Sequence, residues 1–137
     1  MVLVDTSVWS LMLRRHRGDL SSQQILLHDE LKSLIQNGMV TLLGPIRQEI
    51  LSGIRSEAQY EKLRDYLRSF PDEPLSVNDY ESAARLSNSL LSHGETPTSV
   101  DALIASITLS RQWQLFTTDA AFARWAKMLP LRLYAVR

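Results

Sequence analysis

The segment Val2-Leu3-Val4-Asp5-Thr6-Ser7-Val8-Trp9 decides the interpretation of this chain. Its opening Val2-Leu3-Val4 is an uninterrupted apolar run, which is typical of a strand buried on both faces of a sheet. Asp5 follows at once, and a carboxylate beside a buried strand needs a cation or hydrogen-bond donors, because desolvating an unpaired charge is costly. The segment therefore predicts a core strand that brings an acidic side chain to the edge of a sheet.

Short apolar runs of the same kind recur along the chain and alternate with longer segments of helical periodicity. The other predicted strands are 40–43, 75–77, 115–116 and 131–134. The predicted helices are 22–36, a short one that begins at Gly44-Pro45 and ends near Gly53, then 56–70, 79–91, 99–109 and 120–128. Asn78 is the predicted N-cap of the helix over 79–91. This alternation predicts an α/β sandwich.

The composition indicates one compact domain over residues 1–137. The chain has 15 Lys+Arg, 15 Asp+Glu and no cysteine, which excludes disulfide scaffolds, cysteine metal sites and a globally basic nucleic-acid binder. Twelve of the 15 basic residues are arginine, a weak indication of phosphate-bearing partners. The residues before Asp5 leave no room for a secretory signal and no apolar stretch is long enough for a membrane span, so we expect a cytoplasmic protein without membrane contact.

Four acidic residues differ from the rest because each is pressed against apolar sequence: Asp5, Glu49, Asp101 and Asp119. Taken singly, each has an ordinary structural explanation. Asp5 and Asp119 each stand between a strand and a helix, where a carboxylate caps free N–H groups. Asp101 completes a capping-box pattern with Thr98, and Glu49 fits the solvent edge of an apolar helix stripe.

Taken together, the same acids predict a metal site. The ends of parallel strands that lead into helices share one edge of a sheet, so Asp5 and Asp119 are expected there. If Asp101 and Glu49 face that edge, three or four carboxylates converge with no lysine near them in sequence. Oxygen ligands suit Mg²⁺ or Mn²⁺. Zinc is disfavoured, because the chain's histidines, His16, His28 and His93, all lie in polar segments away from these acids.

These residues resemble a known family, the PIN-domain ribonucleases, and most closely the VapC toxins of prokaryotic type II toxin–antitoxin pairs. The likeness spans the whole chain. It rests on four motifs in this order: Val4-Asp5-Thr6-Ser7-Val8-Trp9, Pro45 to Gly53 around Glu49, Asp101-Ala102-Leu103-Ile104-Ala105, and Thr117-Thr118-Asp119-Ala120-Ala121-Phe122.

The resemblance implies a three-layer sandwich whose short, mostly parallel central sheet is flanked by helices. It matches Asp5, Glu49, Asp101 and Asp119 to the family's acidic metal-binding residues, and it matches Thr6, Ser7 and Thr117 to hydroxyl positions beside that site. It also implies an RNA substrate, a cognate antitoxin whose C-terminal segment covers the acidic site, and a homodimer. One departure is Ala121, since family members often carry a further acid just before the aromatic residue of the last motif.

The chemistry of the residues agrees with that resemblance. Hydrolysis of a phosphodiester needs an activated water and charge relief at the phosphate, and metal ions supply both. We expect Asp5 with Asp101 or Asp119 to hold Mg²⁺, and Glu49 to bind through water or orient the attacking water. Thr117 or Ser7 would orient a carboxylate.

Two other functions remain open from the sequence. A phosphatase of the haloacid-dehalogenase kind would use Asp5 as nucleophile, but that chemistry usually wants another acid where Ser7 stands. A non-catalytic PIN-like binding module would use the acids only as helix caps. Arg14-Arg15-His16-Arg17 is either a solvated helix end or a phosphate contact. Core packing is the favoured role for Trp9, Trp113 and Trp125.

Overall fold

A short parallel sheet lies at the centre of the protein. The computed structural model describes residues 1–136 and orders the strands β2 (Val40–Thr41), β1 (Val2–Val4) and β3 (Gln114–Phe116), with β1 parallel to both neighbours. Leu3 lies opposite Thr41 on one side and Leu115 on the other. All of β1 is buried, as its apolar sequence predicts.

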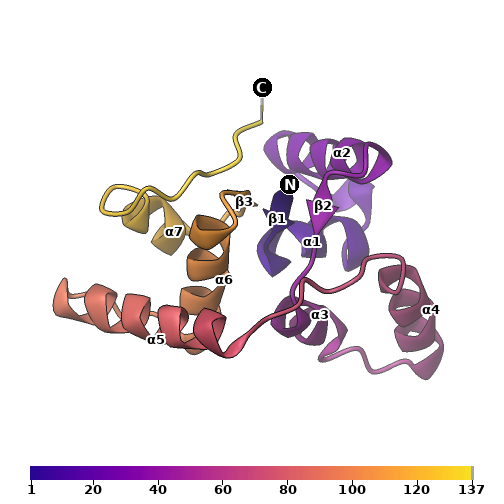
Figure 1. The fold of residues 1–137 in the computed structure, drawn as a ribbon. Coiled ribbons are helices and arrows are strands. Elements are labelled where there is room, and N and C mark those ends of the chain that lie inside the picture. The colour runs from indigo at the N-terminus through magenta and orange to yellow at the C-terminus, as the bar shows by residue number, and fades with distance from the viewer. Residues whose placement is uncertain (137) are drawn as a thin grey trace.

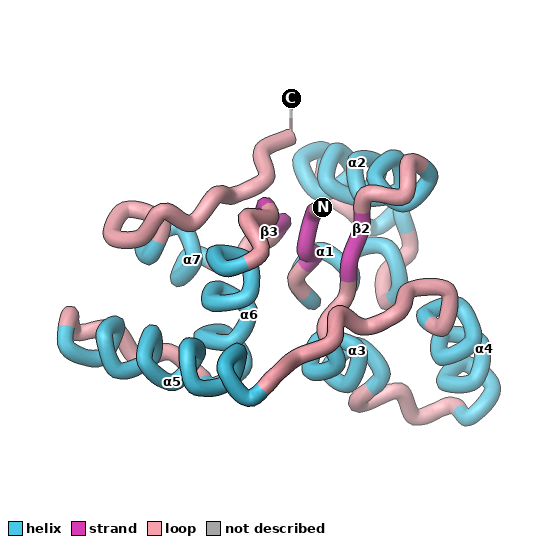
Figure 2. Tube along the Cα trace, in the orientation of Figure 1, coloured by secondary structure: helices cyan, strands magenta, loops and turns pink. Residues whose placement is uncertain are grey.

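Helices make up most of the chain (Figure 2). They are α1 (Thr6–Leu13), α2 (Ser22–Gln36), α3 (Gly44–Leu51), α4 (Glu57–Leu67), α5 (Val77–Ser92), α6 (Ser99–Ser110) and α7 (Ala120–Trp125), with a 3-10 turn over Arg17–Asp19. In Figure 1, α5, α6 and α7 lie beside the β3 edge of the sheet, and α2, α3 and α4 lie beside the β2 edge. This arrangement confirms the predicted α/β class with a short parallel sheet flanked by helices.

The start of α5 corrects two predictions. Residues 75–77 form no strand, because Val77 is the first residue of α5 and is 75% exposed. The N-cap is Ser76 rather than Asn78. Ser76 and Asp79 form a reciprocal capping box, in which each side chain bonds the other residue's backbone N–H.

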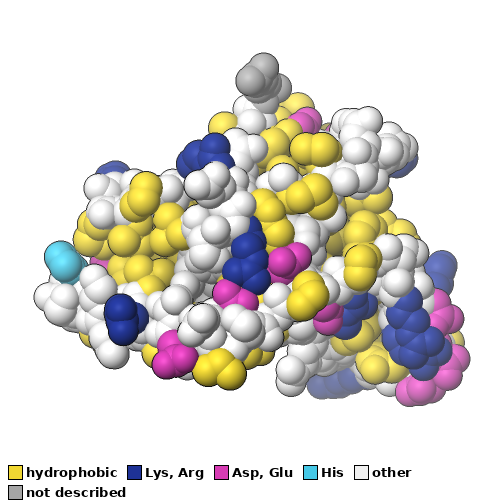
Figure 3. Space-filling model, in the orientation of Figure 1, with side chains coloured by type: hydrophobic (Ala, Val, Ile, Leu, Met, Phe, Trp, Pro, Cys, Tyr) yellow, Lys and Arg dark blue, Asp and Glu magenta, His cyan; other side chains and the backbone are white. Residues whose placement is uncertain are grey.

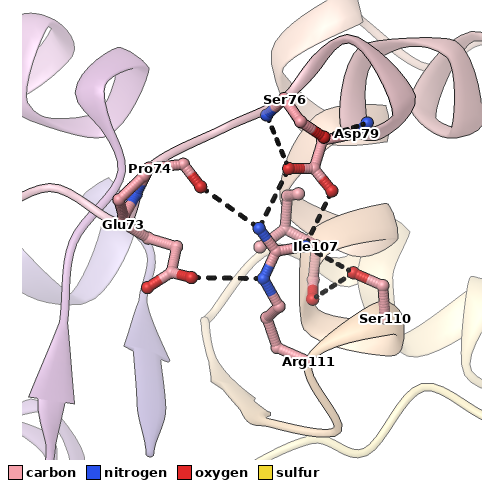
Figure 4. A network of polar contacts seen from close by, with 7 residues as sticks. All are labelled: Glu73, Pro74, Ser76, Asp79, Ile107, Ser110 and Arg111. Atoms are coloured by element: carbon pink, nitrogen blue, oxygen red, sulfur yellow. Dashed lines mark hydrogen bonds and ion pairs between the residues drawn. The ribbon is translucent and has the colours of Figure 1, made fainter.

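Arg111 explains why the helix begins at that point (Figure 4). Its guanidinium donates to both oxygens of Asp79, at 2.7 and 2.9 Å, and to Glu73 at 3.2 Å. The same side chain donates to the Pro74 carbonyl. The bonds from Arg111 and from the Ser76 backbone hold the pKa of Asp79 well below its usual range. One arginine thus fixes the loop that precedes α5.

Other predicted elements are shorter than expected. Residues 131–134 contribute only an isolated bridge between Leu115 and Leu133. The helix expected over 56–70 ends at Leu67, and the helix expected over 120–128 ends at Trp125. Turns follow both helices, so the apolar periodicity continues past the point where regular hydrogen bonding stops.

The core and the surface agree with the composition. Trp9 and Trp125 are fully buried and Trp113 is partly buried, as expected for core residues. Acidic and basic side chains are interspersed on the face shown in Figure 3. Several arginines that were a weak indication of phosphate-bearing partners instead form ion pairs within the fold: Arg17, Arg47, Arg64, Arg111 and Arg124. None of the helices found in residues 1–136 combines the length and the apolar character that crossing a membrane requires.

Candidate metal centre

Asp5 lies at the C-terminal end of β1 and is the most buried of the four candidate acids, with 7% of its surface exposed. It precedes α1 but does not cap it through its side chain. Its Oδ2 instead accepts hydrogen bonds from the Ser7 hydroxyl at 2.8 Å and the Thr117 hydroxyl at 2.9 Å. The capping explanation of Asp5 is therefore wrong.

The two hydroxyls that hold Asp5 are fixed by the turn between β3 and α7. Ser7 Oγ accepts from the Thr118 N–H, and Thr117 Oγ1 accepts from the Asp119 N–H, both at 3.0 Å. Each hydroxyl can then direct its proton at Asp5. The ends of two neighbouring strands thereby orient one carboxylate, with Oδ2 committed to the hydroxyls and Oδ1 left for another partner.

Glu49 reaches the same region from the last turn of α3. Its side chain is exposed, and its Oε2 accepts from the Thr6 hydroxyl at 3.1 Å. Thr6 is the first residue of α1 and follows Asp5 directly. The contact therefore places the Glu49 carboxylate beside the start of α1.

The structure confirms the predicted capping role of Asp119. It is the N-cap of α7, and its Oδ1 accepts from the Ala121 N–H at 2.9 Å. Ala121 thus serves the cap through its backbone and supplies no oxygen ligand. The next residue, Phe122, is fully buried against Trp125. The second oxygen of Asp119 is left without a donor among the described residues.

Asp101 forms half of the predicted capping box. Thr98 Oγ1 accepts from the Asp101 N–H at 3.1 Å, but within residues 1–136 the carboxylate makes no return bond to the Thr98 N–H. Burial raises the pKa of Asp101, and the charges of Asp119, Asp5 and Glu49 raise it further, while hydrogen bonding with Thr98 opposes the shift. Asp101 is therefore close enough to the other three acids to feel their charges.

One open cavity of about 740 Å³ contains all four acids. Arg14 is the basic residue in its lining, and no ion pair between it and an acid of the site appears in the described part of the chain. Three histidines, His16, His28 and His93, are absent from the described lining. The remaining lining residues are Thr6, Ser7, Ser10, Pro45, Gln48, Ser52, Thr98 and Val100. The cavity is thus acidic and rich in oxygen atoms that could coordinate a cation.

The donor set fits a hard divalent cation. Among residues 1–136, no three Asp, Glu, His or Cys side chains already stand close enough together to form a ready-made metal cluster. Mg²⁺ does not need one, because it usually keeps several waters and takes one or two carboxylates from the protein. Asp5 and Asp101 are the two more buried of the four acids.

The sequence analysis missed part of this site. Ser10, Gln48 and Ser52 line the cavity but carry no motif of their own. The sequence marked Arg14 as part of a basic run but did not predict its partners, which are backbone carbonyls at the end of α3. Helical spacing does place Gln48 and Ser52 one turn apart beside Glu49, which is the signal that was available.

Comparison with known proteins agrees with this fold and site. The model of the PIN domain family matches residues 2–128. A chain in the crystal structure of FitAcB from Neisseria gonorrhoeae aligns with a TM-score of 0.72 and 18% identity, covering 98% of this chain and 97% of that one. A chain of VapBC2 from Rickettsia felis, bound to a promoter DNA fragment, aligns with a TM-score of 0.68 and 19% identity, covering 98% of both chains. A structure of FitAB bound to an IR36 DNA fragment gives a TM-score of 0.72 at 18% identity, covering 98% and 94%.

These observations define a class of protein: an α/β domain in which the parallel strands end at a pocket lined by carboxylates. Because the family model covers nearly all of the chain, the protein belongs to the PIN domain family. The similarity to the solved structures supports the same fold. A search of curated proteins gave no match.

Proposed function

We propose that the protein is a Mg²⁺- or Mn²⁺-dependent endoribonuclease and the toxin of a toxin–antitoxin pair. The observation that carries the proposal is the placement of Asp5, Glu49, Asp101 and Asp119 around one cavity, where none of the four forms an ion pair among the described residues. Asp101 is a partly buried carboxylate that feels the negative charges of the other three acids, so a positive ion bound among them would stabilise its charged form. A metal ion is the simplest such partner.

A bound divalent ion supplies a nucleophilic water near neutral pH and relieves charge at the phosphate. The chain's own residues provide the rest. Ser7 and Thr117 both donate to Oδ2 of Asp5, so Oδ1 is the oxygen that could bind an ion. Thr6 donates to Oε2 of Glu49. Glu49 is exposed and is held by Thr6, so it is suited to orient the attacking water, while Asp5 and Asp101 or Asp119 would hold the ion.

The direct test is cleavage of RNA in Mg²⁺ and in excess chelator by the wild type, Asp5→Asn and Asp101→Asn. We expect cleavage that requires the metal and falls by about 100-fold or more in each variant, because even groups that only orient a metal ligand cost 10- to 100-fold. Glu61→Gln is a suitable control, because Glu61 is an exposed acid of α4 outside the cavity and has no bonded partner in the described chain. Cleavage that survives both chelation and the two site substitutions would refute the nuclease proposal.

The alternatives predict other results. A phosphatase that uses Asp5 as nucleophile would release phosphate from a small phosphomonoester and would not cleave RNA internally. Its Asp5 should then be open to substrate, whereas Asp5 has one oxygen committed to two hydroxyls. A non-catalytic module would bind no metal, and calorimetric titration of the purified chain with Mg²⁺ or Mn²⁺ would show no uptake.

The proposed partners are RNA as substrate, a cognate antitoxin and a second copy of the chain. The antitoxin is supported by the likeness to chains in structures of FitAcB, VapBC2 and FitAB, the last two of which are bound to DNA fragments. The RNA substrate and the second copy follow from the resemblance to the VapC toxins. Co-purification with the product of an adjacent small gene tests the antitoxin. Light scattering at several concentrations tests the homodimer, for which we expect twice the mass of one chain.

A further inference from the structure

Glu49 occupies an unfavourable place for a carboxylate. The other three acids stand at the beginnings of helices, with Asp5 before α1, Asp101 in the first turn of α6 and Asp119 before α7. The positive end of the helix dipole favours an anion at those positions. Glu49 instead lies in the last turn of α3, where the dipole end is negative and the carbonyl groups lack partners within the helix.

Arg14 lies against that helix end. Its Nη2 donates to the Glu49 carbonyl at 2.9 Å and to the Ser52 carbonyl at 2.8 Å, and it also contacts the Ile50 carbonyl. A cation at a helix C-terminus is stabilising, and here the bonds reach the backbone of Glu49 itself. Arg14 therefore satisfies carbonyls in the turn that carries the carboxylate.

The two contacts of Glu49 come from opposite ends of α1. Thr6, the first residue of α1, bonds the Glu49 carboxylate, and Arg14, which caps the C-terminus of α1, bonds the Glu49 carbonyl. Asp5 directly precedes the first residue of the same helix. Helix α1 therefore connects Asp5 to Glu49 by a rigid element, and loss of either contact would free Glu49 relative to Asp5.

We propose that Arg14 is a positioning residue for the reaction, which holds the last turn of α3 so that Glu49 points into the acidic cavity. The inference rests on the proposed nuclease function. It differs from the alternative in which Arg14 binds an RNA phosphate, because Nη2 is engaged with the protein backbone. Arg15, the next residue, is exposed and has no bonded partner in the described chain, so Arg15→Ala removes the same charge without the contacts.

The test compares kcat and KM for cleavage of a mixed-sequence single-stranded RNA by the wild type, Arg14→Ala, Arg14→Lys and Arg15→Ala. We expect Arg14→Ala to lower kcat by about 10- to 100-fold, because a small displacement of a catalytic group has an effect of that size. KM should change little. Arg14→Lys should recover only part of kcat, since an ammonium keeps the charge but lacks the planar fork. Arg15→Ala should match the wild type in kcat, and a change confined to its KM would mark Arg15 as a phosphate contact.

A double-mutant cycle identifies the group through which Arg14 acts. If Arg14 works through Glu49, adding Arg14→Ala to Glu49→Gln should lower kcat by less than about threefold further, because residues that act as a unit are not additive. An equal loss in both backgrounds would overturn the proposal. So would a loss seen mainly in KM together with a salt dependence of RNA binding weaker by about one phosphate contact.

Hydrogen exchange separates this inference from the proposed function, because it needs neither RNA nor metal. Backbone amides in the last turn of α3 should exchange faster in Arg14→Ala than in the wild type or Arg15→Ala, while thermal melting confirms that each variant is folded. If the wild type cleaves no RNA but this local loosening appears, the nuclease proposal fails and the contact stands. Unchanged exchange in Arg14→Ala would overturn the positioning role whatever the activity.

Discussion

Asp79 and Asp101 stand at equivalent positions of two helices, and the structure predicts opposite effects of the same substitution. Each aspartate is the third residue of its helix, behind a Ser or Thr N-cap that accepts its N–H. Asp79 is paired with Arg111, whereas Asp101 faces three other acids. In chelator at neutral pH, we expect Asp79→Asn to destabilise the protein and Asp101→Asn to stabilise it.

The magnitude for Asp101 follows from the screened repulsion. Two unit charges 4 Å apart interact by about 1 kcal/mol in water and about 4 kcal/mol at an effective dielectric constant of 20. Asp101 is partly exposed, and two of its three acidic neighbours, Glu49 and Asp119, are exposed, so solvent and salt reduce each term to a few tenths of a kcal/mol. Removing the charge should stabilise the fold by about 1 kcal/mol, or roughly 3–4 °C in Tm for a chain of this length.

The pH dependence has a definite sign at each site. The raised folded-state pKa of Asp101 destabilises the protein above that pKa. The benefit of Asp101→Asn should therefore shrink as pH falls through it and vanish once the unfolded chain is also protonated. The depressed pKa of Asp79 stabilises the protein above the usual carboxyl range. The deficit of Asp79→Asn should be complete at neutral pH and should diminish as pH falls toward the folded-state pKa.

Thermal melting in EDTA and in Mg²⁺ provides the assay. A ligand at 100 times its Kd stabilises the folded state by about 2.7 kcal/mol, so Mg²⁺ should raise the Tm of the wild type above that of Asp101→Asn and invert their order. Asp79→Asn should keep both its deficit and its response to Mg²⁺. If Asp101→Asn lowers the Tm in EDTA as Asp79→Asn does, Asp101 is an ordinary cap and the reasoning is refuted.

Three further predictions test the supports of the site and the core. Ser7→Ala removes a donor to Asp5 and should weaken Mg²⁺ binding, measured by calorimetry, by about 10- to 100-fold; unchanged affinity would contradict the orienting role. Arg111→Ala should lower the Tm by several degrees without altering Mg²⁺ affinity, because its partners lie outside the cavity. Leu3→Ala, at a fully buried position, should lower the free energy of unfolding in urea by about 2–5 kcal/mol. Val77→Ala should change it by less than about 0.5 kcal/mol, and similar losses at the two positions would contradict the correction to residues 75–77.

The sequence was sufficient for features that depend on local pattern. Val2-Leu3-Val4 was predicted as a buried strand from its uninterrupted apolar run, and the acid that follows it marks the end of that strand at the sheet edge. The helix over 22–36 was predicted with its observed bounds, because the apolar spacing is uninterrupted there. Neither inference required knowledge of a distant partner.

The start of α5 shows where local pattern fails. Ser76 with Asp79 and Asn78 with Glu81 are both sound capping pairs by sequence. Arg111, 32 residues beyond Asp79, decides between them by pairing with Asp79. Leu75-Ser76-Val77 alternates like a strand, yet its backbone is committed to the loop and first turn that this ion pair fixes.

The pairing of Arg111 with Asp79 also explains why Asp79 stabilises the fold while Asp101 keeps an unpaired charge. Helix α6 carries Asp101 near its beginning, and Arg111 directly follows its end. Arg111, at the end of α6 that lies away from the cavity, therefore neutralises Asp79 of α5. It cannot reach Asp101, which lies in the first turn of α6. The beginning of α6 offers only the partial positive charge of its dipole. This offsets part of the cost of burying Asp101, and the proposed divalent ion would relieve the rest.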